Sequence, residues 1–497
     1  MPAALVAQSV PAPSHDDIRW LQRASFGLDS ATLARYEQLG RSDWLDEQLS
    51  DRNDSLPPAI RDLISSYPAV STPPAELLAM AIEARQRLKS MPDGDAKVAA
   101  RKHLQKQGRE LAKQAQQAEL LHAIYGSNQI KEQMVWFWLN HFSVYAAKGG
   151  VRLVAADYEE NVIRPHALGK FRDLLLATLK SPAMLQFLDN AKNVKGKTNE
   201  NYARELMELH TLGVGAGYTQ QDVQQLALIL TGAGIAPRGG QQRGRFGRMR
   251  EGVIRDGLFV FNPNKHDFSD KTFLGQRIRG SGYGEIEQAV DLITREPACA
   301  QFISRQLAEY FVADQPPPAL VDAMAKTFQH TGGDITAVLR TMFDSPALLA
   351  SAGRKFKDPT QFLVSAMRLA YDGQPITNAA PLVNWLNQMG EPVFGRITPD
   401  GWPLDAASWS GSGQMAARFV VARAIGSGRN RLFMPDADDE SNRAPIQPGE
   451  VPKLDSPLYR ATIKPWLSEA TRAALGKANT AQEWNTYLLS SPDFNYR

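Results

Sequence analysis

The sequence predicts a mainly α fold: a large multi-helix globular protein with one short β hairpin and long loops. Three observations favour this class. Apolar residues recur with a helical period along most of the chain, strand signals are scarce, and no internal repeat is found. The chain has 497 residues, of which 43% are hydrophobic and 22% charged, so it can bury a large core.

The first half of the chain is expected to contain a long helical hairpin and an aromatic helix. Residues 75–90 and 95–125 are rich in helix formers and are separated by Met91-Pro92-Asp93-Gly94, which predicts a turn. Their alternating charges indicate a solvated face. The aromatic helix covers 129–146. The other helices expected in this half are 16–25, 30–39, 41–50, 152–165, 168–181, 199–212 and 219–231.

A Gly/Arg-rich loop at 234–256 precedes the one predicted hairpin, in which 253–254 pairs with 259–261 across Asp256-Gly257. Residues 1–15 are expected to be a flexible tail and residues 16–497 a single helical domain. This domain could divide into two lobes, 16–233 and 257–497, joined by the loop. The later helices are expected at 284–295, 297–312, 318–330, 333–343, 358–372, 380–389, 413–426 and 466–475.

Composition excludes several classes of protein. The net charge of +3 is too small to indicate nucleic acid as a partner. The single cysteine, Cys299, excludes an intrachain disulfide and leaves both cytosol and periplasm open. No apolar run is long enough for a membrane span. Residues 1–14 lack a basic region and a full apolar region, so they are interpreted as a disordered tail or the remainder of a trimmed signal peptide.

The most informative segment is the predicted helix at 199–212. Asn201, Glu205 and Glu208 fall on one stripe of this helix, and Arg204 lies beside Glu208 at a spacing of four residues. Asn199 is a plausible N-cap, and the glycines after residue 212 would end the helix. So dense a polar stripe predicts either a buried salt-bridge lattice or a functional site.

Histidines in polar, loop-adjacent contexts suggest metal binding. His141 ends the aromatic helix, and His266 is followed by Asp267. Together with Glu205 they give a mixed His/carboxylate set that suits Zn, Mn or non-haem Fe. For each histidine taken alone, a hydrogen-bonded structural role is the alternative. A single Glu-x-x-His motif, formed by Glu119 and His122, is interpreted as surface chemistry because it occurs on a charged helix.

Other chemistries have little support. The sequence contains neither a Gly-x-Ser-x-Gly elbow nor a Walker-type loop. The arginines at 238–255 could bind a polyanion, but basic loops of this kind are usually only solvated. Trp402 and Trp409 could stack on a sugar or peptide ring, although packing of a tight turn is the preferred interpretation.

Several segments together resemble one bacterial family, the domain of unknown function 1800 family, from about residue 16 to the C-terminus. The strongest segment is Asn-Glu-Asn-Tyr-Ala-Arg-Glu-Leu-Met-Glu-Leu at 199–209. The chain departs from the family pattern at Ala233, where a tryptophan is usual, and at Ser269, where a glycine is usual. Supporting segments are 137–142, 163–169, 211–213, 217–219, 230–232, 266–267, 271–275, 401–403 and 488–494.

The resemblance implies a protein of uncharacterised activity, often exported, whose gene often lies beside that of a sulfatase-like family. It therefore implies a periplasmic or secreted location and a sulfatase-like protein as a possible partner.

The leading hypothesis is a metal-dependent enzyme of the cell envelope. Its expected catalytic residues are Glu205, Glu208, Arg204 and Asp267, and its expected ligands to a divalent metal (Fe, Zn or Mn) are His141, His266 and Glu205. Oxidoreductase chemistry is preferred to hydrolysis because helix-borne carboxylates are common at iron sites. The alternative is a non-catalytic envelope scaffold or partner protein, in which the polar stripe fixes helix register. A polyanion binder ranks last, and nucleic acid is not an expected partner.

Overall fold

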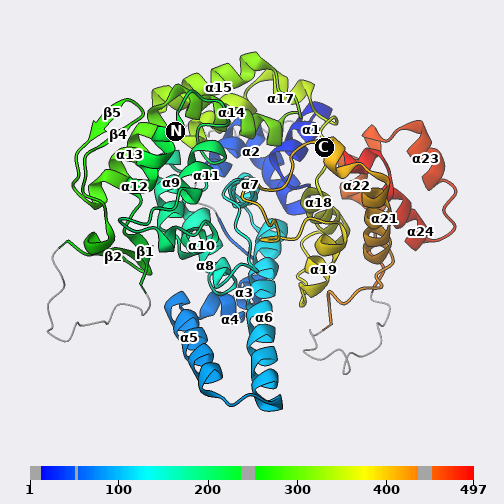
Figure 1. Ribbon diagram of the computed structural model, residues 1–497. Coiled ribbons are helices and arrows are strands. Elements are labelled where there is room, and N and C mark those ends of the chain that lie inside the picture. Colours follow the sequence, from blue (N-terminus) through cyan, green and yellow to red (C-terminus); the bar gives the residue numbers. More distant parts are fainter. Residues whose placement is uncertain (1–12, 51–53, 237–251, 435–449) are drawn as a thin grey trace, which may run out of the picture.

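The protein has the mainly α architecture that the sequence predicts. The computed structural model describes residues 13–50, 54–236, 252–434 and 450–497. In this part of the chain, helices from both halves of the sequence surround α7 (Gln129–His141), which is buried along almost its whole length (Figure 1). A helix that is apolar or paired on every side belongs in a core.

The N-terminal helices pack against this core. They are α1 (His15–Ala24), α2 (Ser30–Gln48), α3 (Pro58–Ser65) and α4 (Pro68–Ser71). Ser14 and Asp17 form a capping box that starts α1. The helices expected at 30–39 and 41–50 are two segments of α2, which kinks at Gly40 where φ is 75°. Of the predicted tail, residues 1–12 lie outside the described residues.

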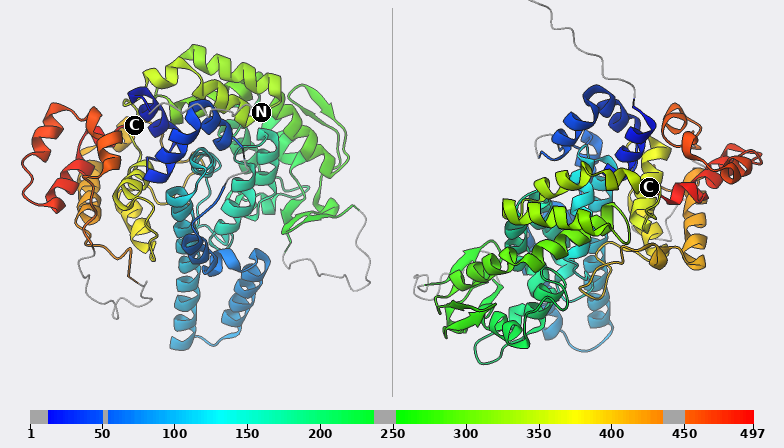
Figure 2. Two further views of the ribbon diagram at one scale, coloured as in Figure 1. Left: turned by 180° about the vertical axis from the view of Figure 1, so that it is seen from behind. Right: turned by 90° about the horizontal axis from the view of Figure 1, so that it is seen from above.

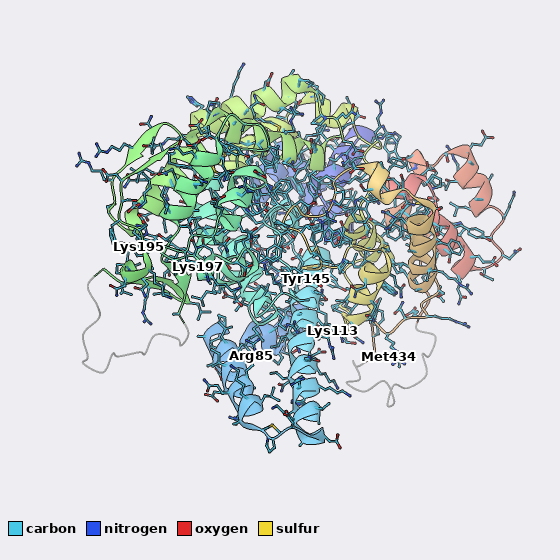
Figure 3. The ribbon with its side chains drawn as sticks, in the orientation of Figure 1. Arg85, Lys113, Tyr145, Lys195, Lys197 and Met434 are labelled. Atoms are coloured by element: carbon cyan, nitrogen blue, oxygen red, sulfur yellow. The ribbon has the colours of Figure 1, made fainter. Side chains whose placement is uncertain are left out.

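The predicted hairpin of long helices is confirmed as α5 (Pro74–Ser90) and α6 (Asp95–Tyr125). Its tip projects from the rest of the molecule (Figures 1 and 2). Exposed side chains such as Arg85 stand on this projecting part (Figure 3). The second half of α6 is different, since residues 117–121 and 123–125 are buried against α18 (Pro359–Tyr371) and α19 (Ala380–Gln388).

After α7 the chain forms short helical turns around the core. One of them, η3 (Tyr158–Ile163), is a π-helix rather than part of the regular helix expected at 152–165. The predicted helix at 199–212 is shorter than expected, because α11 ends at Glu208. The remaining elements of this region are η2 (Val151–Leu153), α8 (Ala155–Asp157), η4 (Arg164–His166), α9 (Phe171–Lys180), α10 (Pro182–Phe187), η5 (Asn190–Lys192), α11 (Asn201–Glu208) and α12 (Gln220–Ile229).

The strands are short and antiparallel. The predicted hairpin is confirmed as β2 (Ile254–Asp256) paired with β3 (Phe259–Phe261). The sequence did not predict β1 (Ala233–Ile235), which pairs with the other edge of β3, or the hairpin of β4 (Lys271–Phe273) and β5 (Gln276–Ile278). Most arginines of the Gly/Arg-rich loop fall at 237–251, outside the described residues.

The second half of the chain adds helices above and beside the core. The first five are α13 (Tyr283–Arg295), α14 (Pro297–Phe311), α15 (Pro318–Thr331), α16 (Ile335–Phe343) and α17 (Pro346–Ala350). In Figure 1, α14, α15 and α17 lie above the core, and α13 lies at its side next to β4. The C-terminal group contains α18, α19, α20 (Ala406–Trp409), α21 (Ser412–Gly426), α22 (Pro457–Thr462), α23 (Glu469–Leu475) and α24 (Ala481–Ser490). The short 3-10 turns of the second half are η6 (Pro263–Lys265), η8 (Lys464–Trp466) and η9 (Asp493–Asn495). No helix in the described ranges combines the length and apolarity that a membrane span needs.

Candidate functional site

The polar helix α11 carries a partly exposed ion-pair chain. The Arg204 guanidinium lies 3.3 Å from a carboxylate oxygen of Glu208 and 3.1 Å from one of Glu200. It also donates to Gln220 of α12 at 2.9 Å. Burial, followed by the charge of Glu208, raises the pKa of the Glu205 carboxyl, and Arg204 opposes this shift. Arg204, Glu205 and Glu208 therefore interact as the sequence predicts.

Glu208 and His141 line one cavity of about 320 Å³. Asp400 and Trp402 form another part of its wall, on a loop that the Asn140 side chain holds. The Asn140 amide oxygen accepts from the Trp402 backbone N–H at 2.6 Å, and its amide nitrogen donates to the Trp402 carbonyl at 3.0 Å. Three distant segments of the chain thus meet at this cavity.

His141 is neutral in this position. Its Nε2 lies 2.9 Å from the carbonyl oxygen of His210, and its ring stacks on Phe137. Burial lowers the pKa of His141 to about 4, and the contact with the His210 carbonyl only partly opposes that shift. A neutral imidazole that donates Nε2–H to this carbonyl ties the end of α7 to the segment that follows α11.

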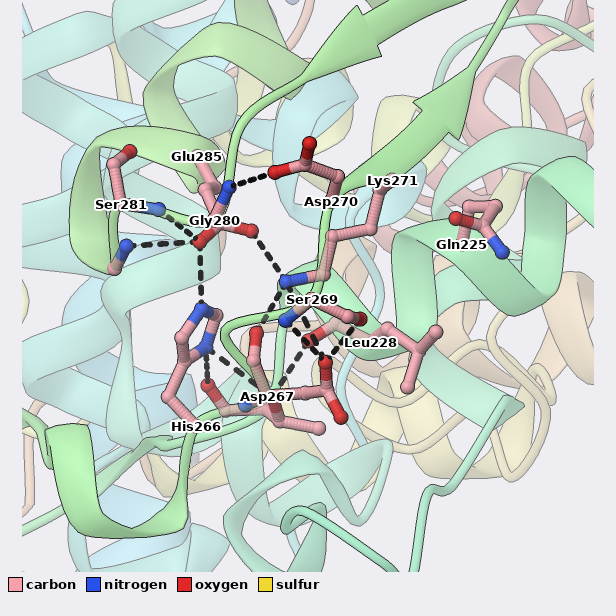
Figure 4. Close-up of polar contacts among 12 residues, drawn as sticks. Gln225, Leu228, His266, Asp267, Ser269, Asp270, Lys271, Gly280, Ser281 and Glu285 are labelled. Carbon is pink, nitrogen blue, oxygen red and sulfur yellow. Dashed lines mark hydrogen bonds and ion pairs between the residues drawn. The ribbon is translucent and has the colours of Figure 1, made fainter.

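His266 belongs to a different, fully buried network (Figure 4). Its Nδ1 lies 2.8 Å from the Thr231 carbonyl oxygen, and its Nε2 lies 2.8 Å from a carboxylate oxygen of Glu285. The second oxygen of Glu285 accepts from Lys271 at 2.6 Å. Both ring nitrogens of His266 are therefore engaged, which is typical of a structural histidine.

Asp267 lies at the edge of the same network. Its carboxylate accepts from the backbone N–H and the hydroxyl of Ser269, and its carbonyl accepts from Lys271. The hydrogen bonds from Ser269, above all the one from its hydroxyl, lower the pKa of Asp267. Neither His266 nor Asp267 lines the cavity beside α11. The structure therefore brings His141, Arg204, Glu205 and Glu208 into one region and places His266 and Asp267 elsewhere.

A second group of ionisable side chains lies where α6, α7 and the π-helix η3 meet. We call it the carboxylate cluster. It comprises Glu119 and His122 of α6, Glu132 of α7, Glu159 and Glu160 of η3, and Arg164 of η4.

Arg164 binds most of the carboxylates. One terminal nitrogen lies 2.8 and 2.9 Å from the two oxygens of Glu132, and the other lies 2.9 Å from Glu159 and 3.5 Å from Glu119. At the outer side of the cluster, His122 Nε2 lies 3.0 Å from a Glu160 oxygen. Within the described residues, His122, Glu159 and Glu160 are the group of potential metal ligands whose donor atoms all lie within 4.8 Å of one another.

The π-helix presents two of these ligands. The Arg164 N–H donates to the Glu159 carbonyl, five residues back, and Pro165 has no N–H with which to continue an α-helical ladder. The Tyr158 hydroxyl, which is buried, donates to the Phe142 carbonyl at 2.8 Å and anchors the turn. As a result Glu159 points inward with no exposed side-chain surface, while 23% of the Glu160 side chain is exposed. π-helical turns occur frequently at functional sites.

The cluster carries more negative than positive charge. Burial, and then the charge of Glu119, raises the pKa of Glu159 well above its ordinary value. Burial also raises the pKa of Glu119. Burial acts in the same direction on Glu160, but the contact with His122 outweighs it and the pKa of Glu160 is lowered. Glu119 Oε1 and Glu159 Oε2 are buried and accept from no donor among the described residues, and the two carboxyls face each other closely enough to share a proton. A proton or a cation placed between these carboxyls would reduce their mutual repulsion.

The sequence interpretation of Glu119 and His122 as surface residues is wrong. Glu119 is 1% exposed, and the His122 side chain is 12% exposed. A signal was present, because residues 118–125 of the otherwise charged helix read Ala-Glu-Leu-Leu-His-Ala-Ile-Tyr. Apolar residues surround both positions there, which indicates burial.

Comparison with protein families gives one match. The family described as "Protein of unknown function (DUF1800)" matches residues 19–496. Neither the curated proteins nor the solved structures that were searched gave a match. Since the family match covers almost the whole sequence, as the motifs at 199–209 and elsewhere predict, the chain belongs to the DUF1800 family of proteins of unknown function.

Proposed function

We propose that this protein is a metal-dependent enzyme and that the carboxylate cluster holds its divalent cation through His122, Glu159 and Glu160. One observation carries the proposal. These three side chains already place one donor atom each within 4.8 Å of the others, beside two buried carboxylate oxygens that accept from no donor in the described part of the chain. The proposal keeps the metal chemistry expected from the sequence but assigns it to other residues.

The donor set fits a divalent transition metal. One imidazole with two carboxylates suits Fe, Mn or Zn, and Glu119 offers a further oxygen. Four carboxyl groups surround Arg164, and burial favours a proton on Glu119 and Glu159; a divalent cation would take the place of such a proton. Arg164 would remain beside Glu132 and Glu159 and orient them.

The site suits one cation. Two-metal carboxylate centres in helical bundles use a Glu-x-x-His motif from each of two helices. Here α6 supplies one such motif, Glu119 and His122. The place of a second motif is taken by Arg164 of η4, whose positive charge would repel a second metal ion. The carboxylate-rich donor set favours redox chemistry over hydrolysis, since such sets are typical of iron and manganese. Substrate would approach from the side of His122 and Glu160, which are the partly exposed ligands.

Metal binding is tested by comparing matched glutamate variants. Protein purified without chelator is analysed for metal, stripped, and titrated with Mn²⁺ and Zn²⁺ by calorimetry. Wild type is expected to bind about one equivalent, and Glu160→Gln at least about tenfold more weakly. Glu205→Gln is the control, because Glu205 belonged to the ligand set expected from the sequence but lies on α11. Equal binding by the two variants, or none by wild type, would contradict the proposed site.

The proposed redox chemistry of the bound metal is tested separately. Protein loaded anaerobically with Fe²⁺ is exposed to oxygen, and the optical spectrum is followed. Oxidation faster than that of free Fe²⁺, and slowed in Glu160→Gln, is expected. Oxidation no faster than in buffer would leave a metal-binding protein without the proposed redox activity.

The envelope scaffold is the second candidate, and one observation favours it. Arg164 satisfies both oxygens of Glu132 and one of Glu159, so the cluster could act only to lock α7 against η3. In that case we propose an exported protein that binds a sulfatase-like partner, as the resemblance implies. Cell fractionation and copurification test this: a cytoplasmic protein that copurifies with no sulfatase-like protein would argue against it.

A further inference from the structure

A second cavity, of about 240 Å³, lies between α1, α18 and the C-terminal segment. Its wall combines basic and apolar side chains: Arg19, Lys357, Arg497, Phe26, Leu369 and Trp466. None of these residues belongs to the carboxylate cluster or lines the cavity beside α11. This cavity therefore needs an explanation of its own.

Two buried cations of this wall have only neutral partners. Lys357 is 8% exposed, and its Nζ contacts the Ser365 hydroxyl at 3.0 Å. Arg497 is 5% exposed and donates to the side-chain oxygen of Gln133 at 2.6 Å and to the Tyr310 carbonyl at 2.7 Å. No carboxylate of the described residues forms an ion pair with either cation within 4.0 Å. A buried charge without a counter-ion is costly.

The surrounding charges increase this imbalance. Arg418 lies near Lys357, and Arg23 lies near Arg497; both arginines are fully buried. Burial, and then Arg497 and Arg418, lower the pKa of Lys357 well below its ordinary value. Asp358 and Glu391 are nearby buried carboxylates, and burial raises the pKa of both, although Asp358 also attracts Arg497. The local excess is therefore positive.

Hydrogen-bond donors in the cavity wall are also unused. An ammonium has three N–H donors, and Lys357 has one hydrogen-bond partner among the described residues, although its Nζ also lies 3.9 Å from the centre of the Phe494 ring. Trp466 Nε1 and Arg497 Nε are buried and have none in the same part of the chain. Asp493, the acidic residue of the wall, is held by the backbone N–H and hydroxyl of Ser468 at 2.9 and 2.8 Å. The cavity thus offers positive charge and free donors together.

We propose that this cavity binds a small organic carboxylate with an apolar body. The carboxylate would take the place beside Lys357 and Arg497 and supply the missing counter-charge. The apolar body would lie against Phe26 and Leu369. A simple inorganic anion would leave these two side chains uncovered. The volume is sufficient, because an apolar cavity of about 150 Å³ holds a benzene molecule.

Binding is tested with benzoate as the probe and benzamide as a neutral molecule of the same shape. Calorimetric titration of the full chain is expected to show benzoate binding at least about tenfold tighter than benzamide, because only benzoate supplies a charge to Lys357. Inorganic phosphate is the third probe and is expected to bind more weakly than benzoate. Tighter binding of phosphate would overturn the apolar-body part of the proposal.

The variant Lys357→Met identifies the cation responsible. It should weaken benzoate binding about tenfold or more, while the melting temperature stays equal or rises because a buried amine with unused hydrogen-bond donors is replaced by an apolar side chain. Lys102→Met, at an exposed position of α6, is the matched control and should leave binding unchanged. If Lys357→Met does not fold, Arg19→Gln at the partly exposed edge replaces it. Benzoate binding that is absent, equal to that of benzamide, or unchanged in the folded variant would overturn the proposal.

Discussion

At the scale of single residues, His141 of α7 and His122 of α6 differ in their surroundings and therefore in the roles open to them. His141 is buried, is held by a carbonyl and has a pKa lowered to about 4, so it is a neutral donor. His122 keeps an open side and contacts a carboxylate instead. The sequence showed His141 after Asn140 and His122 three residues after Glu119, but it could not show which ring nitrogen the fold had already engaged.

The lowered pKa of His141 predicts acid sensitivity. Its folded pKa, about 4, lies below the ordinary value of 6.5, so the unfolded state binds a proton that the folded state does not. Stability is therefore present above 6.5 and is lost as the pH falls toward 4, by at most about 3 kcal/mol from this residue. Urea unfolding at pH 7, 5 and 4 should show this loss in wild type and a shallower loss in His141→Gln. His103→Gln, at an exposed position, should follow wild type. An equal slope in all three proteins would show that His141 is not the cause.

Gly401 holds the loop that carries Asp400 and Trp402 over the cavity beside α11. Its φ is +74°, and a Cβ there would lie 2.3 Å from the Asn140 carbonyl oxygen. Gly401→Ala should therefore lower the free energy of unfolding by about 1–3 kcal/mol. Gly413→Ala is the control, because it lies in α21 with open space around it and should be neutral or stabilising. Chemical denaturation measures both, and similar effects of the two substitutions would contradict this account of the loop.

At the scale of elements, the helical period of apolar residues predicts the long helices and misses the short strands and turns. The hairpin of α5 and α6 and the core helix α7 follow from the sequence because each repeats its pattern over several turns. Strands of three residues, such as β4 and β5, have no room to show a period of two. The π-helix was also missed, because its six residues are too few to show a period of their own.

The contact between these elements depends on Arg164. Replacing it with methionine leaves Glu132 and Glu159 buried without their cation, so metal-free protein should lose about 3–5 kcal/mol of stability. Arg87→Met is the control, because that guanidinium is 80% exposed beside Glu83 and should change stability by less than about 1 kcal/mol. Denaturant titration of both variants after chelator treatment makes the comparison. A loss below about 1 kcal/mol in Arg164→Met would mean that the cluster does not bind η3 to α7.

At the scale of the whole molecule, the candidate metal site is a product of tertiary structure. Its side chains come from α6, α7 and the η3–η4 segment, and only the fold brings Glu119 and His122 next to Glu159 and Glu160. The sequence could indicate the type of chemistry, a mixed His/carboxylate set. It could not choose the residues, because His141 and His266 have equally suggestive neighbours in the chain but are held by backbone and side-chain partners in the structure.

The measurement that tests the central claim most directly is anomalous X-ray scattering from crystals of the protein loaded with Mn²⁺. A peak among His122, Glu159 and Glu160, absent from crystals of Glu160→Gln, is the predicted result. No peak at these residues in fully loaded protein, or a peak instead at His141 or His266, would contradict the proposed metal centre.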